Sequence, residues 1–132
     1  MRLLRLRFAS ALISLVLLLS GCGHDTDHEA NEMPKPIEVK LTVAPMSAKV
    51  DEKVSFEAKV TQDGSNVDNA QEVTFEIWKD GSDKHSKITV ASAGDGKYVM
   101  LKSFSEAGSY HVISHVTADS QHSMPSAVFN VK

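Results

Sequence analysis

The chain has 132 residues, of which 42% are hydrophobic and 23% are charged, and its formal net charge is −3. This acidic balance excludes the usual kind of nucleic-acid-binding protein, because neutralising phosphates requires a high density of Lys and Arg. A single cysteine excludes an internal disulfide, so the fold must depend on a packed core.

Residues 1–21 have the parts of a lipoprotein signal peptide. Arg2, Arg5 and Arg7 form a positive n-region, an apolar run follows, and two small residues precede Cys22. The run is too short to span a membrane. The tetrapeptide Leu-Ser-Gly-Cys that ends at Cys22 resembles a bacterial lipobox. The alternative is an ordinary secretory signal in which the cysteine stands at this place by chance.

The lipobox resemblance implies that the Cys22 thiol carries a diacylglycerol and that this residue becomes the N-terminus after cleavage. The acyl chains would anchor the protein to a membrane, which places it in the cell envelope outside the cytoplasm. Cleavage removes three of the 14 basic residues and leaves 11 against 17 acidic ones, a formal charge of −6. The lipid is then the expected membrane contact, since such a chain gives no polybasic patch.

Residues 22–36 are expected to form a disordered tether. The segment holds almost no apolar side chain and ends near Pro34 and Pro36, so it cannot bury enough surface to fold. His24 and His28, with nearby carboxylates, offer a loose site for a divalent or cuprous ion. A solvated spacer is the simpler interpretation, because chelation would cost a mobile segment its conformational entropy.

Residues 37–132 predict an all-β domain, an antiparallel immunoglobulin-like β-sandwich of about seven strands. Apolar and polar residues alternate, and turn residues interrupt the alternation about every eight to twelve positions. A sustained helical stripe is missing after the signal, so crossover helices and a parallel sheet are not expected. The expected strands cover residues 37–43, 54–60, 73–77, 88–91, 98–104, 108–117 and 127–131.

Two aromatic residues are expected to have structural roles. Gly108, Ser109 and Tyr110 resemble the tyrosine corner of immunoglobulin-like domains, in which a phenol hydroxyl binds upstream backbone. Val112 then takes the inward position that a disulfide cysteine has in antibody domains. Trp78 lies at the end of the third strand, on the face opposite the core residues.

His115, His122 and Met124 form the candidate metal site. Because Tyr110 points inward, strand alternation turns His115 outward. A tight turn near Asp119 would then bring Met124 approximately across from His115, with His122 diagonal to it. Directly opposed β-carbons lie about 4.5–5.5 Å apart, which is within reach of one metal ion.

The donor types of this candidate site favour copper. A thioether beside imidazoles suits copper, above all cuprous copper, better than hard cations such as magnesium. His111 lies about 13 Å along the strand from His115, which is too far to share a mononuclear site. The alternative is that the two outward histidines are ordinary surface residues without a ligand role.

The segment His115–Pro125 resembles the closing motif of the YtkA-like domain family, whose members are small extracytoplasmic immunoglobulin-like domains. The segments Val54–Gln62, Val73–Lys79 and Gly94–Tyr98 also resemble strands of that family, so the likeness covers about residues 37–132. The resemblance implies the same sandwich fold and an extracytoplasmic location.

The family's association with copper-handling and respiratory-oxidase assembly proteins implies a copper cofactor, with His115, His122 and Met124 at matching motif positions. Many members have a further histidine before the Gly-x-Gly-x-Tyr turn, where this chain has Ser92. His85 is an outside candidate for the missing ligand, although its loop is expected at the opposite end of the sandwich from the closing turn. The simpler interpretation of His85 is a polar loop residue.

Two functions fit these residues. The first is a membrane-tethered module that holds copper and exchanges it with a copper-handling or other envelope protein, since three ligands on an open face suit transfer. The second is an interaction domain, in which the same face, with Ile113 and Trp78, docks onto a membrane or envelope complex without metal. The oligomeric state is left open, because strand edges cannot be judged before the sheet order is known.

An enzyme is not expected. The only thiol is assigned to lipid, and the sequence has neither a Gly-x-Ser-x-Gly elbow nor a glycine-rich phosphate loop. Glu57 and Glu76 alternate with core residues, which is typical of a solvated sheet face and not of a catalytic pair.

Overall fold

The computed structural model of the chain describes residues 32–132. The predicted signal peptide, the lipidation site at Cys22 and most of the predicted tether lie outside the described residues. The regular elements between Glu32 and Lys132 are all β-strands. In this part of the chain there is no helix with the length and apolar character that crossing a membrane requires.

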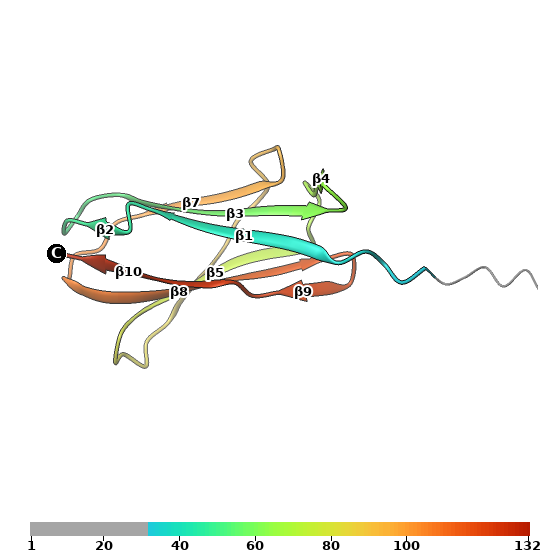
Figure 1. The fold of residues 1–132 in the computed structure, drawn as a ribbon. Coiled ribbons are helices and arrows are strands. Elements are labelled where there is room, and N and C mark those ends of the chain that lie inside the picture. Colours follow the sequence, from blue (N-terminus) through green and yellow to red (C-terminus); the bar gives the residue numbers. More distant parts are fainter. Residues whose placement is uncertain (1–31) are drawn as a thin grey trace, which may run out of the picture. The chain divides into compact units, whose positions relative to one another are not determined.

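Two sheets form the domain (Figure 1). Sheet A consists of β1 (Ile37–Ala44), β3 (Val54–Gln62), β4 (Ser65–Asn66) and β7 (Lys97–Lys102). Its central strand, β3, pairs antiparallel with β1 along one side and with β7 and β4 along the other.

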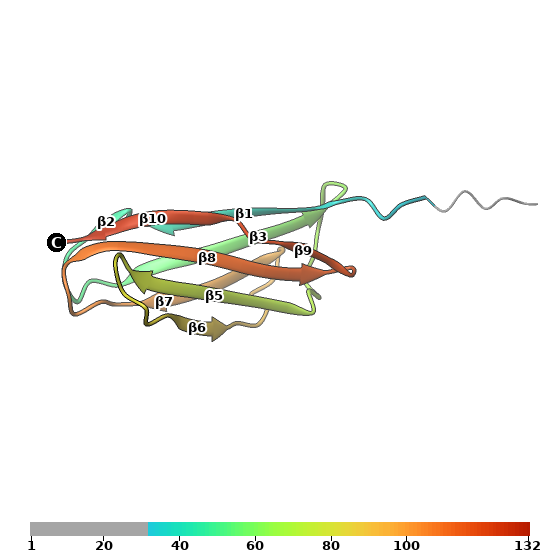
Figure 2. The ribbon, with the colours of Figure 1, turned by 90° about the horizontal axis from the view of Figure 1, so that it is seen from below.

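Sheet B consists of β2 (Ser47–Ala48), β5 (Glu72–Lys79), β6 (Ser86–Thr89), β8 (Gly108–Ala118), β9 (Gln121–Ser123) and β10 (Ser126–Val131). The strand order is β2-β10-β8-β5-β6, and β9 also pairs with β8. Figure 2 shows this sheet with β6 along one edge and β10 near the other. The pairs are antiparallel except for β2 with β10, which is parallel.

The core lies between the sheets and is built from the inward residues of each strand. In β3 and β8 nearly every second residue is buried, because neighbouring side chains of a strand point to opposite faces. Phe56 is fully buried at the centre. Ring centroids at 5.2, 6.2 and 6.3 Å from that of Phe56 belong to Phe129, Phe75 and Phe104. Aromatic contacts of this kind add about 0.5–1.5 kcal/mol each beyond the burial of apolar area.

The predicted β-sandwich is confirmed, and the seven predicted strands correspond to β1, β3, β5, β6, β7, β8 and β10. The other three strands have only two or three residues, too few to show an alternating pattern. β6 begins at Ser86, ahead of the predicted start at Ile88, because Ser86 pairs with Ile77 of β5. Phe104 lies beyond the end of β7, yet its side chain is buried in the core.

Local features at both ends fix the position of β8 in sheet B. The Tyr110 hydroxyl donates a hydrogen bond of 2.8 Å to the backbone carbonyl of Glu106, as a tyrosine corner requires. At the other end, Asp119 and Ser120 have φ values of 48° and 58°, typical of a two-residue hairpin turn. This turn joins β8 directly to β9 and sets the register of the hairpin that carries His122.

The chain is attached to the domain before β1 begins. The backbone carbonyl of Lys35 accepts hydrogen bonds from the side chains of Gln62, at 2.7 Å, and Gln121, at 2.9 Å. Its ammonium group lies 2.7 Å from the Asp63 carboxylate. These contacts fall within the segment predicted as a tether, so the last residues of that segment are held against the ends of β3 and β9.

Candidate functional site

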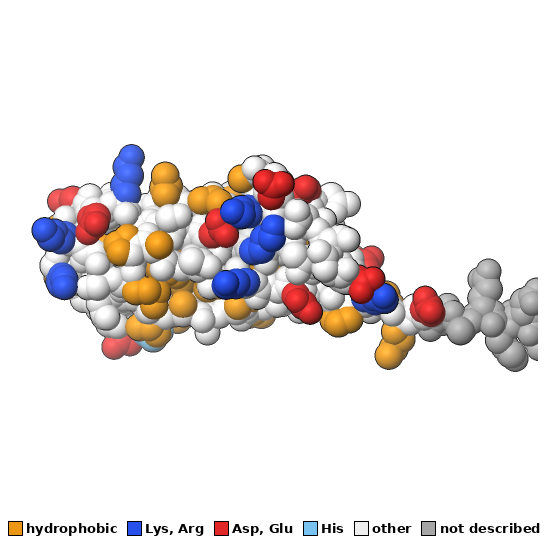
Figure 3. All heavy atoms as spheres, turned by 45° about the horizontal axis from the view of Figure 1, so that its top comes forward, with side chains coloured by type: hydrophobic (Ala, Val, Ile, Leu, Met, Phe, Trp, Pro, Cys, Tyr) orange, Lys and Arg blue, Asp and Glu red, His pale blue; other side chains and the backbone are white. Residues whose placement is uncertain are grey.

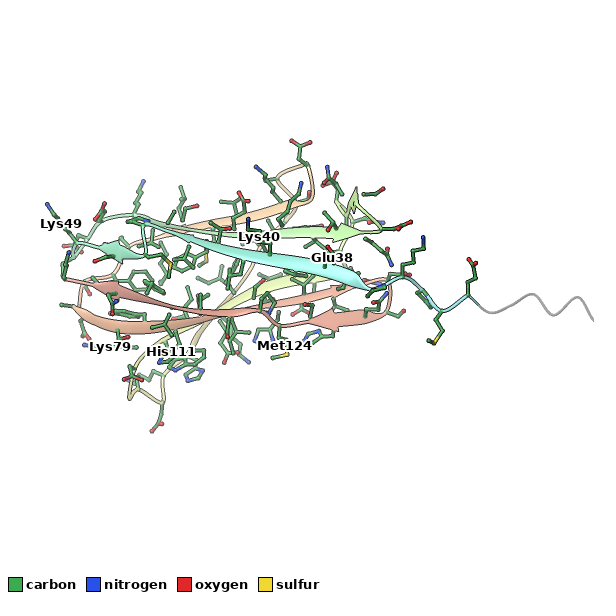
Figure 4. The ribbon with its side chains drawn as sticks, in the orientation of Figure 1. Glu38, Lys40, Lys49, Lys79, His111 and Met124 are labelled. Atoms are coloured by element: carbon green, nitrogen blue, oxygen red, sulfur yellow. The ribbon has the colours of Figure 1, made fainter. Side chains whose placement is uncertain are left out.

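Four histidines in the described part of the chain share one surface, the outer face of sheet B. His111 and His115 lie on β8, His122 lies on β9, and His85 lies between β5 and β6. Figure 4 shows His111 and Met124 projecting on this side of the ribbon. On β8 the histidines alternate with buried residues, which explains why both point away from the core.

The β8–β9 and β8–β10 pairs follow one register. His122 pairs with Thr117, and continuing this register by two positions places Met124 across from His115. His122 is therefore diagonal to His115, and their ring centroids are 6.0 Å apart with an interplanar angle of 40°. Met124 is 50% exposed. The three candidate donors lie in the relative positions that the sequence predicts.

Each imidazole of this pair has one nitrogen in a hydrogen bond. Nε2 of His115 lies 2.6 Å from a carboxylate oxygen of Glu76, and Nδ1 of His122 lies 3.0 Å from the hydroxyl oxygen of Thr117. In metal sites such a bond orients the ring and leaves the other nitrogen for the ion. The available donors are then Nδ1 of His115, Nε2 of His122 and the sulfur of Met124.

Glu76 links the pair to a second group of rings. Its other carboxylate oxygen lies 2.7 Å from Nδ1 of His85, and its side chain is only 14% exposed. Hydrogen bonds from His85 and then His115 lower the pKa of the Glu76 carboxyl from its ordinary value of 4.5, while burial acts in the opposite direction. The positive charge of Lys87 lowers this pKa further. Glu76 is therefore an ionised acceptor at neutral pH.

The second group is a stack of three rings centred on Trp78. The indole is nearly parallel to the His85 ring, with centroids 4.3 Å apart, and to the His111 ring, with centroids 5.1 Å apart. Trp78 and His111 are direct partners in the β5–β8 register. Nε2 of His111 also lies 2.9 Å from a carboxylate oxygen of Asp80. These contacts hold the indole against sheet B and place His111 in a different group from His115.

The loop that carries His85 starts at the expected end of the sandwich, but His85 itself reaches the candidate site. The loop after β5 leaves the sheet near the start of β8, where the Asp80 amide donates to the carbonyl of Ser109 at 2.8 Å. It then folds back over the outer face, so that His85 reaches the same carboxylate as His115. Because Nδ1 of His85 is bonded to Glu76, its remaining nitrogen lies on the far side of the ring from that carboxylate.

Glu76 is the important site residue that sequence reasoning misses. Alternation assigns it correctly to an outer face, but the interpretation as a merely solvated carboxylate is wrong. Its partners come from β8 and from the β5–β6 loop, and neither the strand order nor the path of that loop follows from alternation. The one available signal is that Glu76 and Trp78 share the outward positions of one strand.

The candidate metal site on this face includes a thioether among its donors. Within residues 32–132, no three His, Cys, Asp or Glu side chains are grouped so that they could hold a metal ion. The candidate set of His115, His122 and Met124 has sulfur as its third donor and so is a different kind of site. Two imidazoles with one thioether suit a soft ion such as cuprous copper.

Two surface hollows lie apart from these donors. The larger has a volume of about 460 Å³ and is lined mainly by polar residues: Gln62, Ser65, Asn66, Val67, Asn69, Gln71 and Asp119. The smaller, of about 180 Å³, borders the ring stack and includes Trp78, Lys84, Phe104 and Tyr110 in its lining. The candidate donors line neither hollow.

Comparison with known proteins identifies one family. The sequence model of the YtkA-like family matches residues 31–115. Glu76, Trp78, His85 and His115 lie within the match, whereas the β9 hairpin with His122 and Met124 lies beyond its end. No curated protein sequence matches the chain.

Solved structures with a similar fold have low sequence identity. A superoxide reductase (neelaredoxin) from Ignicoccus hospitalis is 8% identical with a TM-score of 0.48, over 75% of this chain and 82% of that chain. A family 76 glycoside hydrolase from a bovine Bacteroides thetaiotaomicron strain is 14% identical with a TM-score of 0.46, over 73% of this chain and 20% of that chain. Titin M4 is 10% identical with a TM-score of 0.38, over 75% of this chain and 96% of that chain. Likenesses at this level carry no argument about function.

Proposed function

Because the chain belongs to the YtkA-like family of extracytoplasmic domains, we propose that it is a lipid-anchored copper-binding module of the cell envelope. The family match confirms the resemblance predicted from the sequence. In this proposal His115, His122 and Met124 hold one cuprous ion, and Cys22 carries the lipid. The supporting observation is the pair of imidazoles on one hairpin, with centroids 6.0 Å apart and one nitrogen of each ring already hydrogen-bonded, and the strand register that places the exposed Met124 across from His115.

The arrangement of the donors suits exchange of the ion more than storage. Three donors leave a cuprous ion open on its solvent side, and Met124 is half exposed there. A partner protein can then supply a further ligand before the first three release the ion, whereas a closed cage of four would hold it. The proposed partner is a copper-handling protein of the envelope, and the proposed function involves binding and transfer without a catalytic step.

The lipid and the segment after it would limit where this exchange takes place. The chain from Cys22 to Lys35, where the backbone first contacts the domain, can extend over at most about 45 Å. A domain on so short a connection meets partners close to the membrane surface. This part of the proposal rests on the lipobox sequence.

An anaerobic titration with cuprous copper against a calibrated competing chelator tests the metal site. The protein begins at residue 22 and carries Cys22→Ser, His24→Ala and His28→Ala, so that the thiol and the N-terminal histidines do not bind the ion. We expect one cuprous ion per chain. Adding His115→Ala, His122→Ala and Met124→Leu should weaken binding by more than the roughly 100-fold that loss of an outer-shell contact can cause.

The matched control is His111→Ala in the same background. His111 lies on the same strand and face as His115 but belongs to the Trp78 stack, so its loss should leave the cuprous affinity unchanged. Circular dichroism of each variant establishes that the β-fold is retained. Equal binding by the parent and the triple variant, or no binding by either, would overturn the proposed metal site.

The second candidate function is docking of a protein partner without metal. Trp78 and the half-exposed Val128 on the outer face of sheet B favour it. A hollow of about 180 Å³ adjoins the indole at the edge of the sandwich, where Lys84 of the β5–β6 loop and Lys102 of sheet A also line it. Tryptophan at the edge of a pocket is common in interaction hot spots. If the protein binds no copper, its affinity for the envelope partner should fall in the variant Lys84→Glu, which changes the lining of this hollow. The control variant Lys40→Glu, on sheet A, should bind that partner like the wild type.

A further inference from the structure

We infer that Glu76 fixes the ring tautomers of His115 and His85 in opposite senses, and that it thereby assigns Nδ1 of His115 as the copper donor. The tautomer assignment depends on hydrogen bonds alone. Its consequence for copper rests on the proposed function. Glu76 is in this account a positioning residue that contacts no metal.

The argument begins with what a carboxylate can do. An ionised carboxylate only accepts hydrogen bonds, so each nitrogen bonded to it must carry a proton. Glu76 has Nε2 of His115 at 2.6 Å on one oxygen and Nδ1 of His85 at 2.7 Å on the other. A neutral imidazole has one N–H group. In their neutral forms His115 therefore carries its proton on Nε2 and His85 on Nδ1, which leaves a lone pair on the other nitrogen of each ring.

The order of the strands shows on which side of β8 Glu76 lies and on which side the other candidate donors lie. β8 lies between β5, which carries Glu76, and the β9–β10 side, which carries His122 and Met124. The Nε2 side of the His115 ring is bonded toward β5. Nδ1 is the ring nitrogen that this bond leaves available, and the His122 ring has its centroid 6.0 Å from that of His115. Without Glu76 the ring would lose the contact that favours this tautomer and this orientation.

His122 does not have the same constraint. Its Nδ1 is bonded to the hydroxyl of Thr117, and a hydroxyl can both donate and accept. Either tautomer of His122 satisfies that bond. Glu76 is thus the group on this face that determines which nitrogen of the candidate metal pair is free before an ion arrives.

The shared carboxylate also couples the metal site to the ring stack. An ion bound to Nδ1 of His115 would make the Nε2 proton more acidic and would strengthen its bond to Glu76. The competing bond from His85 then weakens, and the His85 ring is stacked on Trp78 at 4.3 Å. Copper binding should therefore change the indole fluorescence, although Trp78 is not a ligand. Glu76→Ala should abolish this change.

The first test measures the tautomers without metal. Long-range ¹H–¹⁵N correlation spectra at about pH 8.5, above the ordinary range of histidine titration, distinguish the protonated from the unprotonated ring nitrogen. In the parent protein we expect the Nε2–H form of His115 and the Nδ1–H form of His85. In Glu76→Ala both rings should relax toward a mixture, whereas Glu57→Ala, at a mid-strand outward position of sheet A, should leave both unchanged.

A second variant keeps the test informative if removal of the side chain disturbs the sheet. In Glu76→Gln the amide oxygen can accept from one ring, but the amide nitrogen must donate to the other. One of the two histidines should therefore switch to the opposite tautomer. An Nδ1–H form of His115 in the parent protein, or unchanged tautomers in both Glu76 variants, would overturn the inference.

The second test measures cuprous affinity in the background described above. Loss of the orienting carboxylate should weaken binding about 10- to 100-fold, as for other outer-shell contacts of metal-binding histidines. Glu57→Ala should bind like the parent. The predicted tautomers without any copper binding would support the assignment and overturn only the proposed function. Full affinity in Glu76→Ala would overturn the positioning role and leave the proposed function intact.

Discussion

The two outer faces of the sandwich follow the same strand pattern but carry different side chains. On sheet A the outward residues include Glu57, Lys97 and Leu101. Figure 3, turned so that the top of Figure 1 comes forward, shows Lys beside Asp and Glu, with hydrophobic side chains among them. The Lys97–Glu57 ion pair there is loose, with a distance of 3.9 Å. On sheet B the outward residues include histidines, Trp78 and Met124, and one carboxylate accepts from two rings within 2.7 Å.

This contrast shows where to look for function on a sandwich domain. Solvent exposure explains the charged side chains of sheet A, since surface ion pairs as loose as Lys97–Glu57 contribute little to stability. It does not explain four histidines on one face, each with a ring nitrogen in a hydrogen bond. The outer face of sheet B is therefore the better candidate for specific binding.

The largest expected effect comes from the core that both faces share. Phe56→Ala should lower the free energy of unfolding by about 3–5 kcal/mol, because it removes a fully buried ring that contacts three others. Urea unfolding measures the change. Leu101→Ala, at a position 62% exposed on sheet A, should stay within about 0.5 kcal/mol of the wild type. A similar loss in both variants would contradict the assignment of the core.

The next effect concerns the thioether of Met124, the candidate sulfur donor on the outer face of sheet B. Met124→Leu should weaken cuprous binding by roughly tenfold, equivalent to about 1.4 kcal/mol, and cupric binding by less, because a thioether is a soft ligand. Competition titrations with each oxidation state measure this difference. The matched control, Leu101→Met, puts a thioether on the outer face of sheet A and should create no copper site. Equal losses for both ions would count against Met124 as a ligand.

A third prediction concerns Tyr110, which has a structural role on β8, in contrast to the candidate ligand His115 on the same strand. Tyr110→Phe removes the hydroxyl that donates to Glu106 and should cost about 0.5–1.5 kcal/mol of unfolding free energy. Tyr110 points into the core and His115 away from it, so the cuprous affinity should not change. Urea unfolding and the copper titration on the same sample measure both. A variant that loses copper affinity but no stability would contradict this separation.

The alternation of apolar and polar residues along the strands explains how much of the fold the sequence predicts. Long strands alternate visibly, and the closing turn is short, so the architecture and the relative positions of His115, His122 and Met124 follow from the sequence. The tyrosine corner follows too, because Gly and Tyr stand together at the start of a strand. These features depend on neighbours along the chain or across one hairpin.

The missed features depend on elements far apart in the sequence. Glu76 and His115 come together because β5 is next to β8, and the alternation of either strand does not specify that neighbour. His85 joins them through the path of a loop that has no periodic signal. Several strong contacts of the candidate site are thus tertiary, which is why a carboxylate interpreted as solvated proves to bind two histidines.

The smallest expected effect is the acid dependence that Glu76 gives to sheet B. Hydrogen bonds from His85 and His115 lower its pKa in the folded state from 4.5, so the carboxylate contributes stability that is present above about pH 4.5. This contribution is lost as the pH falls through the lowered folded value. As the pH falls below about 4.5, the urea midpoint of the wild type should therefore fall further than that of Glu76→Gln. Glu57→Gln should follow the wild type, because its carboxylate on sheet A has only the loose contact with Lys97. A parallel decline in all three proteins would mean that the two faces do not differ in this respect.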